Sequence, residues 1–290
     1  NIYSNQRNHQ AELVLSKENK KAKIDGKDVL KISEYVGYLN VVVFVPDDLS
    51  LVKGSPSTRR KFIDLELSKI SPIYAFYLAK YNRLLKERNQ YLKLLSKKNG
   101  KYDDYLETID EQMVDVQLKV IEKRENFIER LSKNVKDVYK SIADNEEYVD
   151  LHYLCFIKKK DKEELLKLYK KEFSRDLKYL STTHGIHKED MKIMIDRKSA
   201  HQYASQGQQR TIVLSIKIAL LELIKEEIGE YPILLLDDVL SELDDQRKTK
   251  LLDILNNRIQ TFITTTSIDG IEHHVIKEAK KININRKEKQ

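Results

Sequence analysis

Two aspartates at the end of an apolar run are the residues of this sequence best placed to carry out chemistry. Residues 233–236 (ILLL) are followed directly by Asp237 and Asp238. A buried parallel strand would deliver both carboxylates to its carboxyl end, where open α/β sheets bind their ligands. Mg²⁺ is usually held by one or two carboxylates together with phosphate oxygens. We therefore predict Asp237 as a metal ligand and Asp238 as the group that orients or deprotonates an attacking water, although an aspartate capping the next helix would give the same pattern.

A second candidate segment is SQGQ at residues 205–208, which precedes an amphipathic helix predicted over residues 211–228. Free backbone N–H groups beside a serine and a glycine at a helix N-terminus form a ready phosphate site. An ordinary serine N-cap would look the same. Downstream of the two aspartates, residues 241–244 read SELD. The order of SxGQ, helix, apolar strand ending in two acids and SELD turn matches the pattern of an ATP-binding cassette.

The strands that must position these residues are predicted from the hydrophobic pattern. Four strands are expected, at residues 40–45, 191–195, 232–236 and 260–266. The run at 40–45 (NVVVFV) reads as a fully buried strand, and stretches 10–15 and 22–24 predict a β-hairpin. Strand–helix–strand order near the C-terminus predicts a parallel α/β sheet, to which both ends of the chain contribute.

Long helices are predicted between the two halves of that sheet. Apolar residues recur at 3/4 spacing over residues 73–98 and 106–142, interrupted by Arg88 and Arg124. The short link containing Asn99-Gly100 predicts an antiparallel helical hairpin. Its apolar stripes would suit either a coiled-coil seam or a helical lobe packed against the rest of the domain. Further helices are expected at residues 165–180 and 246–258.

The composition narrows the class of protein. The chain has 290 residues, of which 40% are apolar, and this is enough to bury a core. Eight glycines and four prolines argue against a many-stranded sandwich or barrel and favour long helices. The single cysteine, Cys155, excludes an intrachain disulfide and a multi-cysteine zinc site. No apolar run reaches the ~18–20 residues of a membrane span.

The net charge of +7 is unevenly distributed. Residues 51–100 hold twelve Lys and Arg against three acids, so the rest of the chain is close to neutral. Such a local excess is expected of a surface that binds a polyanion, although a solvated helical face would also explain it. The candidate DNA-binding residues in this segment are Arg59, Arg60, Lys61, Arg83 and Arg88.

Four segments carry motifs of a known family. Residues 203–211 (YASQGQQRT) and 234–245 (LLLDDVLSELDD) hold the cassette-like motifs. Residues 45–64 follow the pattern P-D-L…G-x-P…R-R-x-F-x-D, and residues 184–190 (HGIHKED) are close to a G-P-H-R-D-D segment, with three departures. Together these segments resemble the RecF family of DNA replication and repair ATPases, and the matches extend over residues 1–266.

The resemblance implies the fold. It predicts an ABC-type ATPase head, an α/β fold with a P-loop NTPase-like mixed sheet and flanking helices, related to the heads of SMC and Rad50 proteins. An all-α helical-hairpin lobe would be inserted in it. The implied division is a head formed by residues 1–56 and 181–290, with a helical arm domain at residues 57–180.

The resemblance also implies ATP and Mg²⁺ as cofactors, bound between two heads. Ser205 and Gly207 would contact the γ-phosphate held by the other subunit, Asp237 would match the metal acid and Asp238 the catalytic acid. The residues implied in ATP binding are Ser205, Gln206, Gly207, Gln208, Asp244 and Thr265. The implied partners are duplex or gapped DNA, RecO, RecR, RecA downstream, and a second copy of the chain in an ATP-dependent homodimer. The implied location is the cytoplasm, at the nucleoid, with no membrane.

One motif of the family is absent. The sequence contains no G-x-x-x-x-G-K-[ST], the loop that cradles the β- and γ-phosphates. In the family this loop lies upstream of the position of Asn1, so we expect the chain to be the C-terminal portion of a longer protein and to lack ATP hydrolysis alone. No Gln follows the strand that ends at Pro46, and residues 264–266 (TTT) stand where many cassette ATPases place a switch histidine.

The leading hypothesis is an ATP-dependent DNA-binding protein of recombinational repair that dimerises through ATP and recruits recombination mediators. The main alternative is an SMC- or Rad50-like structural head, in which the helical hairpin would begin a long coiled coil. The link at Asn99-Gly100 makes the hairpin short for that role. A third alternative, a cassette subunit of a transporter, needs a coupling surface that the sequence does not show.

Overall fold

The computed structural model describes residues 2–3, 8–15, 20–29, 39–143, 147–255, 258–266 and 277–284. The predicted hairpin is confirmed, because β3 (Ala11–Leu15) pairs antiparallel with β4 (Lys20–Ile24). Part of its turn, residues 16–19, lies outside the described residues. The other short strands of this region are β1 (Ile2–Tyr3), β2 (Asn8–His9) and β5 (Lys27–Asp28).

The sheet that carries the two aspartates is parallel and comes from both ends of the chain, as predicted. Its order is β11 (Thr261–Thr264), β10 (Ile233–Asp237) and β6 (Val41–Phe44). The prediction that residues 40–45 form a fully buried strand is wrong, because Val43 is 39% exposed. In the register of the sheet, Leu235 lies opposite both Val43 and Phe262, so these side chains share one face. Among the described residues, it is the opposite face of the sheet, with Val42, Leu234 and Leu236, that packs against the core.

One long helix, α8 (Gln206–Ile228), lies against β6 and is buried on most of its circumference. It begins at Ser205 and ends at Gly229, whose φ of 90° is the left-handed conformation that glycine adopts easily. Near its middle the ammonium group of Lys217 donates to the Val43 carbonyl at 2.8 Å and pairs with Asp48 at 2.9 Å. These contacts fix α8 against the end of β6. The shorter α9 (Asp245–Leu255) follows the two aspartates.

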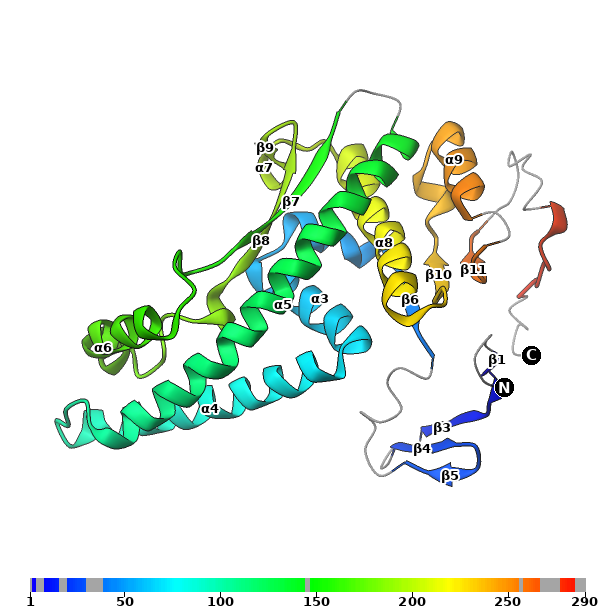
Figure 1. The fold of residues 1–290 in the computed structure, drawn as a ribbon. Helices are drawn as coiled ribbons and strands as arrows, with labels where there is room; N and C mark the ends of the chain where they lie inside the picture. Colours follow the sequence, from blue (N-terminus) through cyan, green and yellow to red (C-terminus); the bar gives the residue numbers. More distant parts are fainter. Residues whose placement is uncertain are drawn as a thin grey trace, which may run out of the picture.

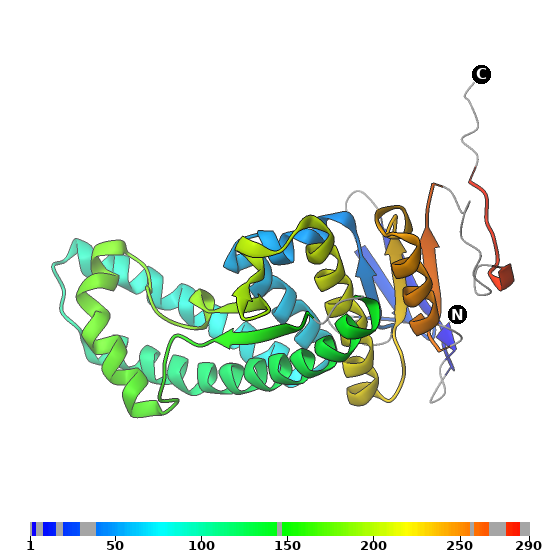
Figure 2. The same ribbon diagram turned by 90° about the horizontal axis from the view of Figure 1, so that it is seen from above.

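The arm is an antiparallel helical hairpin, α4 (Pro72–Lys97) and α5 (Asp104–Ile142), which projects from the head (Figures 1 and 2). The predicted turn is confirmed, since Asn99 has a φ of 49°, which asparagine tolerates better than most residues. Asp103 caps α5 by accepting a hydrogen bond from the Leu106 N–H at 3.0 Å. Other elements of this region are α3 (Pro56–Ile70), α6 (Lys162–Tyr179), β7 (Val149–Leu154), β8 (Asp190–Ile195) and β9 (Lys198–Ser199). The short helices between these elements are η1 (Pro46–Leu49), α2 (Ser50–Lys53), η2 (Ile186–Lys188), α7 (Ala200–Tyr203) and η3 (Leu240–Glu242).

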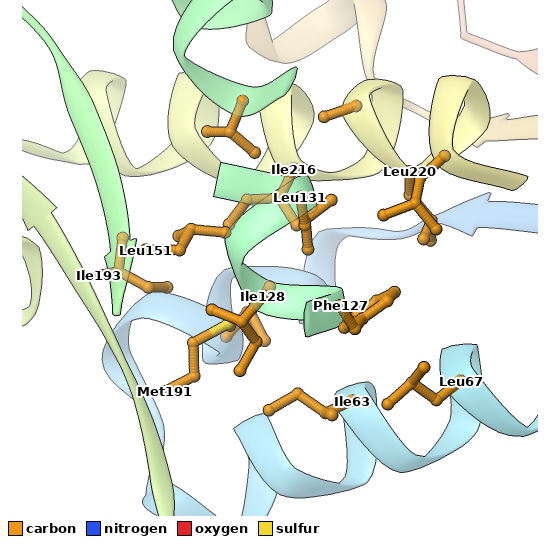
Figure 3. Packing of buried hydrophobic residues seen from close by; sticks show 14 of the residues in the cluster. Ile63, Leu67, Phe127, Ile128, Leu131, Leu151, Met191, Ile193, Ile216 and Leu220 are labelled. Carbon is orange, nitrogen blue, oxygen red and sulfur yellow. The ribbon is translucent and has the colours of Figure 1, made fainter. Parts of the chain in front are cut away.

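A single hydrophobic core joins the arm to the head. Side chains of α3, α5, β8 and α8 meet in it, as Figure 3 shows for Ile63, Ile128, Met191 and Ile216. All four are completely buried. Fully burying an aliphatic side chain contributes about 1.5–3 kcal/mol, so this shared core holds the base of the arm firmly to the head. No helix of the described ranges combines the length and apolar character needed to cross a bilayer.

The arginine that interrupts the stripe of α4 is a buried structural group. Arg88 has no exposed surface and donates to Asp110 at 2.5 Å, Asp176 at 2.6 Å and the Thr182 hydroxyl at 2.9 Å. Burial alone would lower the pKa of Arg88, but the Asp110 and Asp176 carboxylates raise it overall, so the guanidinium stays charged. The prediction that Arg88 contacts DNA is therefore wrong, because the side chain cannot reach a phosphate.

The arginine that interrupts the stripe of α5 has a similar role. Arg124 donates to the Tyr74 hydroxyl at 3.0 Å, to Asp64 at 2.7 Å and to Glu189 at 3.1 Å. It also donates to the Ile186 carbonyl at 2.8 Å. These partners come from α3, α4 and the segment before β8, so one side chain ties three parts of the arm base together.

Candidate functional site

Asp237 and Asp238 lie at the carboxyl end of β10, as predicted. Asp237 is exposed and accepts a hydrogen bond of 2.5 Å from the hydroxyl of Thr264, its neighbour on β11. The Asp238 N–H donates to the Thr264 carbonyl at 3.1 Å and to its hydroxyl at 3.2 Å. Thr264 therefore holds both aspartates in place at the edge of the sheet.

Asp238 is the unusual residue of this edge. Its φ of 53° lies in the left-handed region, which is uncommon for residues other than glycine. Its Oδ1 atom is buried and has no hydrogen-bond partner among the described residues. Buried polar atoms without a partner are rare in native proteins and point to a water, an ion or a ligand. The local structure therefore holds a carboxylate oxygen ready for a partner that the described residues do not provide.

These residues fit a magnesium ion that is shared with phosphate oxygens. Within the described ranges no group of three or more His, Cys, Asp or Glu could enclose a metal ion. Mg²⁺ usually keeps several waters and takes only one or two carboxylates plus substrate phosphates, so the exposed Asp237 carboxylate could hold it together with a bound phosphate. A bound ion would neutralise charge on the phosphates, and Asp238 would remain free to orient a water.

The SQGQ segment forms the N-terminus of α8. The Gln208 N–H donates to the Ser205 hydroxyl at 3.2 Å, and the Ser205 N–H donates to the Gln208 side-chain oxygen at 2.7 Å. This reciprocal capping box is the ordinary structural explanation of the serine, and it also fixes the orientation of the loop. Gln206 is exposed, and a Cβ atom at Gly207 would lie 3.6 Å from Nη1 of Arg247. The turn therefore presents backbone and Gln206 to solvent beside a cation.

Glu147 connects this turn to the arm, and no motif in the sequence pointed to this residue. One of its carboxylate oxygens accepts from the Gln208 amide at 2.6 Å, and the other accepts from the Tyr139 hydroxyl at 3.0 Å. Burial and the Glu147 carboxylate raise the pKa of Tyr139, so its hydroxyl stays protonated as the donor. The end of α5 is thus linked to the start of α8 through a single carboxylate.

Asp244 and Thr265 lie at two different places. Asp244 accepts from the Arg247 N–H at 2.9 Å and pairs with the Arg247 guanidinium at 3.0 Å, so it caps α9. Because Arg247 is also the neighbour of Gly207, it brings Asp244 and the SQGQ turn to the same part of the head. Thr265 directly follows β11 and is half-buried at the edge that holds Asp237. The predicted residues therefore form two groups. The acid edge consists of Asp237, Asp238 and Thr265, and the turn region consists of residues 205–208 and Asp244.

Comparison with known proteins identifies the family. Over 283 residues the chain is 44% identical to "DNA replication and repair protein RecF" of Staphylococcus carnosus (strain TM300), covering 95% of this chain and 76% of that protein. The protein of the same name from Geobacillus sp. (strain WCH70) is 44% identical over 275 residues, covering 92% and 74%. The chain belongs to the RecF family. A scan against protein-family models gave no match.

A solved RecF structure confirms the fold. The structure described as "Structure of the recombination mediator protein RecF-ATP in RecFOR pathway" superimposes with a TM-score of 0.82 at 36% identity, covering 90% of this chain and 71% of the other. The predicted family and the predicted ATPase-head fold with a helical insertion are therefore confirmed. The chain spans about three quarters of the length of these curated relatives.

The basic residues predicted to contact DNA differ in how far they are exposed. Arg59 is only 8% exposed and donates to both oxygens of Asp190, at 2.7 and 2.9 Å. Its charge is thus paired within the fold, so Arg59 does not present a free cation to DNA. Arg60 is half-buried and donates to a backbone carbonyl at 2.5 Å, and burial lowers the pKa of its guanidinium. Lys61 and Arg83 are exposed, so only these two present their charge freely to solvent.

Proposed function

We propose that this chain acts as a RecF-type recombination mediator, which binds DNA and associates in pairs through ATP. The observation that carries the proposal is the 44% identity to a RecF protein. The aligned region covers 95% of the chain and includes both the acid edge and the SQGQ turn. The related proteins are named for DNA replication and repair, and a solved RecF structure is described with ATP. Both properties are transferred to this chain as part of the proposal.

In the proposed ATP site each chain supplies two half-sites. Asp237 would hold Mg²⁺, and Asp238 would orient a water through its free Oδ1. Ser205 and Gly207 would face the γ-phosphate bound by a second copy, where the positive end of α8 stabilises negative charge. Asp244 and Thr265 would contribute at the same interface, Asp244 beside the turn and Thr265 at the acid edge.

DNA binding would use the exposed basic residues. Lys61 and Arg83 lie on α3 and α4, and Arg60, which precedes Lys61 on α3, is partly accessible. RecO and RecR are the proposed partners of the DNA-bound pair, with RecA acting downstream. Binding to chromosomal DNA would place the protein at the nucleoid in the cytoplasm.

The structure favours this function over that of an SMC- or Rad50-like structural head. The hairpin turns at Asn99, and α6 packs across its distal part to form a second small core. Phe173 of α6 contacts the ring of Tyr102 edge-on there, with the centroids 5.5 Å apart. A closed tip of this kind is suited to a compact lobe and leaves no free helix end from which a coiled coil could extend.

The decisive experiment measures DNA binding against salt. Fluorescence anisotropy of a labelled gapped duplex should give a Kd for the 290-residue chain that rises steeply between 50 and 200 mM NaCl, because phosphate contacts release counterions. An affinity that stays constant over this range would remove the DNA-binding part of the proposal. The same preparation should show no ATP hydrolysis by itself, since the sequence lacks a G-x-x-x-x-G-K-[ST] loop.

A further inference from the structure

Two motifs of the sequence converge on a cavity that the ATP site does not use. The G-x-P…R-R segment (residues 54–60) and the end of HGIHKED (residues 184–190) are far apart in the chain. They meet around a cavity of about 460 Å³ between the start of α3, β8 and α7. The residues of its wall that matter here are Lys53, Ser55, Arg59, Asp190, Lys192 and His201.

On one side of this cavity the charges of Arg59 and Asp190 neutralise each other. Arg59 binds both oxygens of Asp190, and another of its N–H groups donates to the Gly54 carbonyl at 2.9 Å. Gly54 is required there, since a Cβ atom would lie 2.3 Å from the Ser50 carbonyl oxygen. Asp190 is the only acid among the residues of the cavity wall, and its charge is compensated by Arg59. The remaining charged groups of the wall are therefore positive.

The open side of the cavity carries these positive groups. Lys53 and Lys192 are exposed, and neither has a carboxylate partner in the part of the chain that the structure describes. The Ser55 hydroxyl, 2.7 Å from that of Ser57, adds a hydrogen-bonding group. Two ammonium groups without counter-charges beside a hydroxyl provide the charge and donors that a phosphate oxygen needs.

Lys53 also connects this cavity to the surroundings of the SQGQ turn. Lys53 lines a second, adjacent cavity of about 320 Å³, whose other walls include Gln206, Gln209 and Arg210 of α8. An anion held by Lys53 would therefore lie beside the first turn of α8. An anion bound at this position could therefore affect the conformation of the SQGQ turn, which is proposed to face ATP.

We propose that this cavity is a phosphodiester site, in which Lys53 and Lys192 hold the backbone of a bound DNA strand beside the start of α8. The proposal rests on the proposed function and adds residues that the sequence did not single out. A phosphate group could also come from free ATP or inorganic phosphate, which share the same chemistry, so the experiment separates these sources.

The test compares two double variants with equal charge changes. Lys53→Gln/Lys192→Gln removes the two ammonium groups of the cavity, and Lys93→Gln/Lys97→Gln removes two exposed ones near the arm tip. Affinity for a gapped duplex at 100 mM NaCl should fall about tenfold or more in the first, and the slope of log Kd against log salt should fall by about two. The second should change the Kd less than about twofold. Thermal melts of both variants should match the wild type, because all four side chains are on the surface.

The outcomes are distinct. If the two variants lost equal DNA affinity, or if the cavity variant lost none, the proposed site would be overturned. The proposed function would still stand, provided that the wild-type chain binds the duplex. If the wild-type chain binds no duplex at all, the proposed function fails first. Isothermal titration with ATP and with inorganic phosphate completes the comparison. Weaker binding of these anions by the cavity variant, with unchanged DNA affinity, would assign the cavity to a free anion and overturn the DNA proposal.

Discussion

Arg88 at the arm and Asp238 at the sheet edge both hold polar side-chain atoms buried away from solvent, but the surroundings of these atoms differ. The Arg88 guanidinium donates to two carboxylates and a hydroxyl, and it stacks 4.8 Å from the centre of the Tyr169 ring. The Oδ1 atom of Asp238 has no partner among the described residues. A charge whose hydrogen bonds are all made within the chain stabilises the fold, whereas one left unpaired is available to a ligand. Charge in a sequence therefore indicates function only where the structure leaves it unsatisfied.

The largest effect should come from breaking the saturated cluster, which is Arg88 with its partners Asp110, Asp176 and Thr182. Arg88→Met leaves Asp110 and Asp176 buried without their counter-charge, so the free energy of unfolding should fall by about 3–5 kcal/mol. Urea denaturation followed by circular dichroism measures this change. Arg83→Met, an exposed arginine of the same helix, serves as the control and should stay within about 0.5 kcal/mol. A normally stable Arg88→Met with weakened DNA binding would instead restore Arg88 as a DNA contact.

A second test uses pH and concerns His187, which contacts Thr182 of the saturated cluster. Burial lowers the pKa of His187 from its ordinary 6.5 to about 4, while its ring nitrogens contact the Tyr81 hydroxyl at 2.8 Å and the Thr182 carbonyl at 2.9 Å. Between these two pKa values the unfolded chain binds the proton and the folded chain does not, so stability falls as the pH falls. From pH 7.5 to 5 this histidine should reduce the free energy of unfolding by about 2 kcal/mol.

The control for the pH test is His187→Gln, which cannot take up a proton. Denaturation midpoints of the wild type and the variant should converge as the pH is lowered, because only the wild type loses this contribution. Parallel pH profiles for the two proteins would show that His187 does not titrate as the structure indicates.

An intermediate effect is expected at Glu147, which links the end of α5 to the start of α8. Glu147→Gln keeps the shape of the side chain but replaces one of the two oxygens that accept from Tyr139 and Gln208 with a donor. Stability should fall by about 1–2 kcal/mol, as expected for losing a hydrogen bond to a charged group. Glu111→Gln, on the exposed face of α5, is the matched control. Identical denaturation curves for the two variants would mean that Glu147 does not link the arm to α8.

The smallest effect should be at the acid edge. Asp238→Asn removes a charge that no side chain of the described structure satisfies at Oδ1, so the free energy of unfolding should change by less than about 0.5 kcal/mol. Asp110→Asn, in the saturated cluster, should lose several times more. The pair of denaturation curves therefore tests the comparison directly, and a large loss in Asp238→Asn would assign that residue to the fold.

The sequence predicted the framework well because periodicity and turn chemistry are local. The hairpin over residues 73–142, its turn at Asn99 and the parallel strand before Asp237 are all confirmed. The basic residues were predicted less well, since Arg59 and Arg88 have their carboxylate partners on distant segments. No local pattern reveals such partners. Glu147 was missed for the same reason, because its role depends on a contact with Gln208 across the fold.

The parallel pairing of β6 with β10 has a consequence for how the chain is made. Roughly 190 residues separate Phe44 from Ile233, so at about 5–20 residues per second a ribosome would take about 10–40 s to produce the partner of β6. The contacts of α4 with α5 are much more local and can form during that interval. We expect the nascent protein to complete its arm first and to close this sheet later, so that the acid edge is assembled only after β10 and β11 have been synthesised.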